Sequence, residues 1–179
     1  AVCDDMDVSD VIEATETVKV TDISELVTGA NNIANTNNNP EAKIIDISSY
    51  YNDGYTLENA GVAIDGNIAS GEDSGAAIRT AAGEEASVVL DLGDAYLPSQ
   101  FEKLILGYSN PRTYAADTKV ELSLDGENYT TVAENNGYSC KKDNAGTADL
   151  NIINLDKLSV YTEAGVRYVK ISVSVGSNG

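Results

Sequence analysis

Side chains that carry out nucleophilic or acid–base catalysis are scarce in this sequence. It contains no histidine, which excludes a Ser-His-Asp arrangement and a histidine general acid. The two cysteines, Cys3 and Cys140, therefore have no histidine partner, and they are too few and too far apart for a zinc site. The 29 Asp and Glu residues could supply a carboxylate pair for glycoside hydrolysis, but no pair stands out. These side chains favour binding over catalysis.

The segment GYSNPRTYAAD, Gly107 to Asp117, combines the side chain types that bind sugars. Aromatic rings cover the apolar face of a sugar ring, and the planar groups of Arg and Asn hold its hydroxyls. The segment supplies the ligand-binding candidates Tyr108, Asn110, Arg112 and Tyr114. Arg112 is one of only 11 basic residues in a very acidic chain, so we expect this cation to have a specific role. The alternative is a surface loop in which Arg112 forms a salt bridge.

Two further segments contain tyrosines that could take part in binding. SSYYNDGYTLEN holds Tyr50, Tyr51 and Tyr55, and we take Tyr51 and Tyr55 as additional ligand-binding candidates that could offer a stacking platform. The alternative is that one or two of these tyrosines are core residues with a hydroxyl at the surface. ENNGYSCKKDNAG contains Tyr138 and suits either a binding rim or a plain hairpin loop.

The segment IDGNIASGED places oxygen-bearing side chains close together on a turn. Such a turn suits a hard cation, because calcium takes six to eight oxygen ligands in irregular geometry. Gly66 would let the chain fold around the ion. The alternative is an ordinary Asp-Gly turn in which Asp65 caps backbone amides.

Composition limits the partners of this chain. The 179 residues carry a net charge of −18, which disfavours nucleic acid and anionic membrane surfaces. No apolar run is long enough for membrane insertion, and no signal peptide is visible at residue 1, although a mature secreted protein would have lost it. Cys3 and Cys140 either form a disulfide, as in an extracellular protein, or are two free thiols.

Strand signals dominate from residue 42 onward. In KVELSLDGENYTTV, Lys119 to Val132, an Asp-Gly step separates two strand-forming runs and predicts a β-hairpin. Further strands are expected at Ala42–Ser48, Ala86–Gly93 (stopped by Gly93), Phe101–Ser109, Ala148–Leu155 and Val166–Val175. No long helical period occurs. The pattern predicts an all-β fold, a β-sandwich or jelly roll of about eight strands.

The first part of the chain has a different composition. Residues 1–30 are acidic, and NNIANTNNNP, Asn31 to Pro40, is Asn-rich and reads as a loop or linker. We therefore divide the chain into residues 1–39, an acidic N-terminal segment and linker that could add an edge strand, and residues 40–179, the β-sandwich.

Four segments in order resemble one family. They are AIDGNIASGE (Ala63–Glu72), SVVLDLGDAYLPSQFEKLILGYS (Ser87–Ser109), YAADTKVELSLDGENYTTV (Tyr114–Val132) and VRYVKISVSV (Val166–Val175). The chain resembles discoidin-type domains, the fold of the coagulation factor V and VIII C-domains, and is similar to family 32 carbohydrate-binding modules. The resemblance covers roughly residues 40–175 and implies a galactose-binding-domain-like jelly roll whose end loops hold a ligand.

The resemblance also implies roles for individual residues. It places the segment with Tyr51 and Tyr55 at the same end of the sandwich as the ligand loop, where an Arg such as Arg112 touches the ligand. It implies a structural calcium ion with the ligands Asp65, Asn67, Ser70 and the last strand near Ser172 or Ser174. The chain departs from the family pattern in lacking two tryptophans, one of which is replaced by Tyr129, and a glutamate near its end.

Together these observations predict a non-catalytic carbohydrate-binding module of an extracellular or cell-surface bacterial protein. Its partner would be a glycan or cell-surface polysaccharide, and the module would be a monomeric part of a larger multidomain protein. The missing tryptophans favour the alternative, a protein-binding adhesin or structural spacer module with no sugar ligand.

Overall fold

The computed structural model describes residues 27, 29–49, 56–67, 85–101, 103–108, 114–140 and 149–175. Seven strands lie within these residues: β1 (Lys43–Ile47), β2 (Glu85–Tyr96), β3 (Lys103–Tyr108), β4 (Tyr114–Ser123), β5 (Thr130–Cys140), β6 (Asp149–Asn154) and β7 (Val166–Val175). Each strand predicted from residue 42 onward is present. The prediction that Gly93 stops its strand is wrong, because Gly93 adopts a φ of +81° and β2 continues to Tyr96 with a shift in its register against β7.

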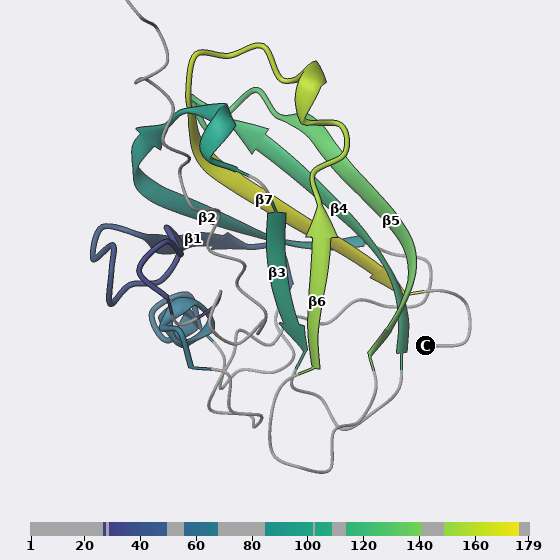
Figure 1. Ribbon diagram of the computed structural model, residues 1–179. Helices are drawn as coiled ribbons and strands as arrows, with labels where there is room; N and C mark the ends of the chain where they lie inside the picture. The colour runs from purple at the N-terminus through teal and green to yellow at the C-terminus, as the bar shows by residue number, and fades with distance from the viewer. Residues whose placement is uncertain are drawn as a thin grey trace, which may run out of the picture.

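The strands form two antiparallel sheets. The larger sheet has the order β1-β2-β7-β4-β5, and β3 pairs with β6 in a two-stranded sheet. Figure 1 shows β3 and β6 lying across one face of the larger sheet. We call this face the inner face and the opposite one the outer face. The predicted all-β sandwich is confirmed.

Alternation along the strands produces the core between the sheets. In β7, Val169 and Val173 are buried on the inner face, as the period of two predicts. Ile171 lies between them and is paired with Val88 of β2 and Val120 of β4. The largest fully buried apolar side chains come from strands of both sheets: Leu92, Val120, Leu122, Val132, Ile153 and Val166. Burial of these side chains is the main stabilising contribution to the fold.

The predicted hairpin at Asp125-Gly126 is confirmed. Gly126 has a φ of +79°, a conformation that a residue with a Cβ adopts only at a cost. Asp125 Oδ1 accepts hydrogen bonds from the backbone N–H groups of Glu127 and Asn128, each at 2.8 Å. These bonds hold the pKa of the Asp125 carboxyl well below its ordinary value. The turn between β4 and β5 is thus closed by side chain to backbone bonds.

The Asn-rich segment is a packed loop, so of the two alternatives, loop or linker, the structure shows the loop. Asn35 is only 3% exposed. Asn39 Nδ2 lies 2.8 Å from the carbonyl oxygen of Leu92 and 3.2 Å from the hydroxyl of Tyr96, so it ties the loop to β2. Glu41 packs so closely on Gly93 that a Cβ there would meet it. Residues 1–26, including Cys3, lie outside the described residues.

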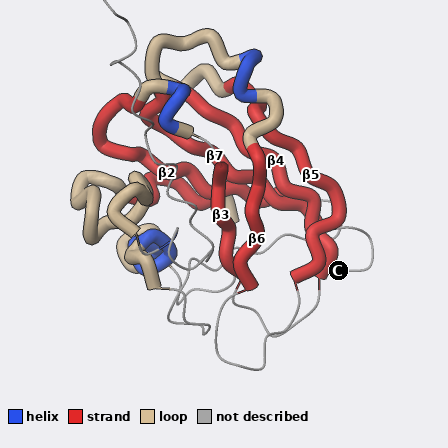
Figure 2. Tube along the Cα trace, in the orientation of Figure 1, coloured by secondary structure: helices blue, strands red, loops and turns tan. Residues whose placement is uncertain are grey.

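Apart from the single helical residue Val27, helical structure in the described part of the chain is confined to short 3-10 turns (Figure 2). They are η2 (Ala60–Ile64), η4 (Pro98–Gln100) and η5 (Leu158–Val160). Among the described residues, no helix has the length and apolar character needed to cross a membrane.

Candidate functional site

Several loops leave the sandwich at one end, which we call the loop end. Tyr108, the last residue of β3, is paired with Asp149, the first residue of β6. Tyr114, the first residue of β4, is paired with Cys140, the last residue of β5. The described residues that flank the connections 109–113 and 141–148 therefore lie side by side, as Figure 1 shows at the lower end of β3, β4, β5 and β6.

The segment after β1 leaves from the same end of the larger sheet. Ile47, the last residue of β1, is paired with Val88 near the start of β2. Glu85, the first residue of β2, is paired with Ser174, which is also paired with Asp117 of β4. Register alone therefore brings the start of the tyrosine-containing segment to the loop end.

The predicted sugar-binding residues are placed only in part. Tyr108 and Tyr114 mark the two strand ends that flank the connection 109–113, as expected for a loop between β3 and β4. Their side chains lie outside the described part of the structure, as do Asn110 and Arg112. Tyr51 and Tyr55 lie outside it as well. The positions of the strands bring the flanks of these segments together, and the ligand-binding roles stay predictions.

The turn predicted to hold calcium is built around Asp65. Its Oδ1 accepts a hydrogen bond from the backbone N–H of Asn67 at 2.7 Å, and Gly66 between them has a φ of +78°. The Asp65 carbonyl oxygen also accepts a bond from the side chain amide of Asn37. This is the capped Asp-Gly turn given above as the alternative to a metal site, and it keeps Asp65 and Asn67 close together.

Ser172 does not lie with these two residues. The turn follows η2, whose Ala60 packs with Ile44 and Ile47 of β1 on the inner side of the sheet. Ser172 alternates with the inward-facing Val173 and points to the outer face. A calcium ion held by Asp65 and Asn67 would therefore take its other ligands from elsewhere. Ser70 lies outside the described residues, within which no group of three or more Asp, Glu, His or Cys side chains is suited to a metal.

The Arg in the VRYVKISVSV motif is held by an ion pair. Arg167 donates through Nε to Asp91 Oδ1 at 2.9 Å and through a terminal nitrogen to Oδ2 at 3.1 Å. The side chain of Asp91 is 6% exposed, and the bonds from Arg167 lower the pKa of its carboxyl. The guanidinium also lies 5.3 Å from the centroid of the Tyr168 ring. Arg167 therefore links β7 to β2.

Sequence reasoning missed a polar hollow on the outer face of the larger sheet. Its volume is about 390 Å³, and its lining includes Glu85, Lys119, Glu134 and Ser172. The only sequence signal was the alternating polar positions of β4 and β7. That signal is the same as for an ordinary solvent-facing side of a sheet, so it could not predict a hollow.

Comparison with known proteins bears on the fold. The sequence matches no protein-family model and no curated protein sequence. Among solved structures, allantoicase aligns with a TM-score of 0.54 at 16% identity, over 83% of this chain and 41% of the allantoicase chain. The chain thus spans less than half the length of that protein, and at this identity the similarity concerns the fold alone.

Two carbohydrate-binding modules from Clostridium perfringens are also similar. CpGH89CBM32-5, in complex with GalNAc-β-1,3-galactose, aligns at 19% identity with a TM-score of 0.49, over 79% of this chain and 89% of that one. The family 32 module of NanJ, in complex with galactose, aligns at 16% identity with a TM-score of 0.48, over 79% and 88%. TM-scores below 0.5 add no evidence about a ligand. From its strand order and its motifs, this chain has a discoidin-like β-sandwich fold.

Proposed function

We propose that this chain is a non-catalytic carbohydrate-binding module that holds a glycan at its loop end. The observation that carries the proposal is the convergence of strand ends described above, which sets Tyr108 and Tyr114 at either side of the connection containing Arg112. The side chain chemistry of that connection, aromatic rings with Arg and Asn, matches what a neutral sugar ring requires.

The mode of binding follows from these residue types. Tyrosine rings would cover the apolar face of a sugar, and Arg112 and Asn110 would hold adjacent hydroxyls. A shallow site of this kind buries few ligand atoms, so we expect modest affinity for a single sugar. The absence of histidine in the sequence fits binding without acid–base chemistry.

The setting that we propose is an extracellular or cell-surface bacterial protein with further domains. In such proteins, a weak module becomes effective when it is linked to others, because the second binding event is then intramolecular. A structural calcium ion at the Asp65 turn is part of the same proposal.

A glycan array tests the proposal. The purified chain is applied in calcium buffer, alongside Arg112→Ala and the charge-matched control Lys103→Ala. Lys103 is an exposed cation at the first residue of β3, the opposite end of that strand from Tyr108. We expect a defined set of glycans to bind wild type and Lys103→Ala, and Arg112→Ala to lose the signal. Silence from a folded chain, or equal binding by all three proteins, would reject the loop site.

A further inference from the structure

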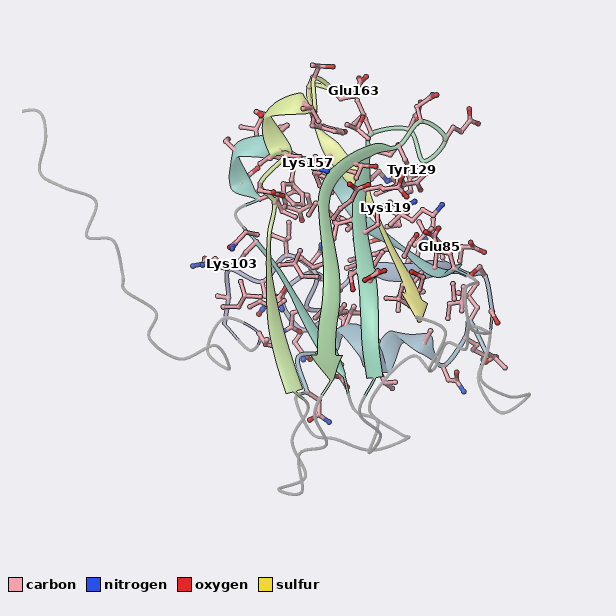
Figure 3. All side chains as sticks on the ribbon, turned by 90° about the vertical axis from the view of Figure 1, so that its right-hand side faces the viewer. Glu85, Lys103, Lys119, Tyr129, Lys157 and Glu163 are labelled. Atoms are coloured by element: carbon pink, nitrogen blue, oxygen red, sulfur yellow. The ribbon has the colours of Figure 1, made fainter. Side chains whose placement is uncertain are left out.

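The hollow on the outer face is formed by four strands of the larger sheet. Glu85 comes from β2, Ser172 and Ser174 from β7, Lys119 from β4 and Glu134 from β5, and Lys157 completes the rim. Figure 3 shows Lys119 and Glu85 on the same side of the sheet, with Lys103 on the far side of the sandwich. At about 390 Å³ the hollow is large enough for a small molecule.

The lining contains a buried hydroxyl without a partner. Ser172 is 1% exposed, and its Oγ has no hydrogen-bond partner within the described part of the chain. The register places it between Ser87 of β2 and Lys119 of β4. Buried polar side chains in native structures are nearly always hydrogen-bonded, so each exception calls for an explanation. A ligand that reaches this hydroxyl from the hollow would supply the missing partner.

The charges around the hollow largely neutralise one another. Lys119 Nζ lies 3.5 Å from Glu85 Oε2 and 3.6 Å from Glu121 Oε2. Lys157 Nζ lies 2.7 Å from Glu134 Oε2. These pairs leave hydrogen-bonding capacity unused, because an ammonium has three donors and a carboxylate about four lone-pair sites.

This lining selects for one class of ligand. A hydroxyl group both donates and accepts, so a molecule with several hydroxyls can use the spare sites of the ion pairs and of Ser172 together. An anion would meet the carboxylates of Glu85, Asp117 and Glu134. An apolar molecule would remove water from ion pairs without replacing its hydrogen bonds. The described lining residues include no aromatic ring for stacking.

We propose that this hollow binds the hydroxyls of a neutral sugar unit and is a second carbohydrate site, separate from the loop end. It binds through hydrogen bonds to Ser172 and the neighbouring ion pairs, whereas the loop end uses tyrosine rings. Ser174 and Asp117 are paired near the start of β4, so the hollow begins close to the loop end. The inference does not depend on the loop site.

The test is an NMR titration of the ¹⁵N-labelled full chain with galactose, in which the shifts of the backbone amide signals are measured. We expect the amides of Ser172 and Lys119 to shift, and Ser172→Ala to weaken this binding by about fivefold or more through loss of one hydrogen bond. Ser159→Ala, which removes a hydroxyl from the exposed Ser159 in η5, is the matched control and should bind as wild type does. Galacturonate, which adds a carboxylate, should bind more weakly than galactose.

Other outcomes separate the two sites. Shifts confined to residues 107–116 would overturn the second site and leave the proposed function standing. Shifts confined to the hollow would support the second site and reject the loop site. No shift at Ser172 and Lys119 up to the solubility limit of galactose, unchanged binding by a folded Ser172→Ala variant, or tighter binding of galacturonate would each overturn the inference.

Discussion

Two buried serines of this sandwich differ in their hydrogen-bond partners. Ser123 is 0% exposed, and its Oγ donates to Asp125 Oδ1 at 3.0 Å and accepts from the Gly126 N–H at 2.9 Å. Ser172 is as deeply buried but has no partner within the described residues. A buried hydroxyl contributes to stability through its partners, so the two serines are expected to respond differently to removal of that hydroxyl.

We predict that Ser123→Ala lowers the free energy of unfolding by about 1–2 kcal/mol, because it leaves the hairpin turn without two hydrogen bonds. Ser172→Ala should change it by less than about 0.5 kcal/mol or raise it, because no bond is lost and the cost of a buried unpaired hydroxyl is removed. Urea unfolding of both variants measures the difference. A loss for Ser172→Ala equal to that for Ser123→Ala would mean that Ser172 Oγ has a structural partner.

The ion pair between Asp91 and Arg167 predicts how stability depends on pH. The pKa of the Asp91 carboxyl in the folded chain lies below its ordinary value of 3.8. The carboxylate therefore binds protons less readily in the folded chain than in the unfolded one. Its contribution is therefore fully present above pH 3.8 and is lost as the pH falls through the lowered pKa.

The variant Asp91→Asn tests whether the charge on Asp91 stabilises the fold. Near neutral pH we expect a loss of about 2 kcal/mol in unfolding free energy, typical of hydrogen bonds to a charged group. The difference between wild type and variant should shrink as the pH is lowered from about 4. Urea unfolding at several pH values measures it. A difference that stays constant down to the acid transition would show that charge on Asp91 is not what stabilises the fold.

At the scale of elements, the packing of the Asn-rich loop on β2 depends on Gly93. It has a φ of +81°, and a Cβ there would come within 2.4 Å of Glu41 Cβ and 3.2 Å of its backbone carbon. Gly61 of η2 offers a contrast, since a Cβ there would meet nothing within 4 Å. The surroundings of Gly93 thus require a glycine, whereas those of Gly61 do not.

We predict that Gly93→Ala lowers the unfolding free energy by about 2 kcal/mol or more, through the positive φ and the contact with Glu41. Gly61→Ala should leave it unchanged or raise it by up to about 1 kcal/mol, because alanine restricts the unfolded chain. Thermal unfolding of the two variants is the measurement. Equal melting temperatures would mean that the loop moves away from β2 at little cost.

The sequence predicted the elements better than their contacts. Alternation and the Asp-Gly turn were enough to predict each strand in the described part of the chain, because both are local signals. The packed role of Asn39 was not predictable, since composition indicates a loop without indicating which distant carbonyl its amide will reach. Gly93 was predicted to end its strand, but its positive φ lets β2 continue to Tyr96 with a shift in register.

The sequence predicted some parts of the candidate site and missed others. Strand register brings the flanks of the connections 109–113 and 141–148 together, and the roles of the predicted sugar-binding side chains stay predictions. Ser172 was assigned to the calcium site, but it points to the outer face because each residue in a strand alternates sides and Val173 faces inward. The hollow that it lines depends on side chains from four strands, which no single segment reveals.

At the scale of the whole molecule, a net charge of −18 means that any cation will stabilise the fold somewhat by screening. Specific calcium binding must exceed that effect. We predict that CaCl₂ raises the melting temperature more than NaCl at matched ionic strength, because binding to the folded state alone stabilises it. In Asp65→Asn, whose amide oxygen can still accept the bond from Asn67, the extra rise should vanish. An equal rise in the wild-type melting temperature in the two salts would reject specific calcium binding.

Binding of a sugar at the loop end is tested by the dissociation constant for the glycan that gives the strongest array signal. Calorimetry compares wild type, Arg112→Ala and Lys103→Ala in the same buffer. We predict that Arg112→Ala binds at least about tenfold more weakly, as expected when a bidentate contact is lost, and that Lys103→Ala binds as wild type does. Equal constants for all three proteins, or no measurable heat with any glycan, would contradict it.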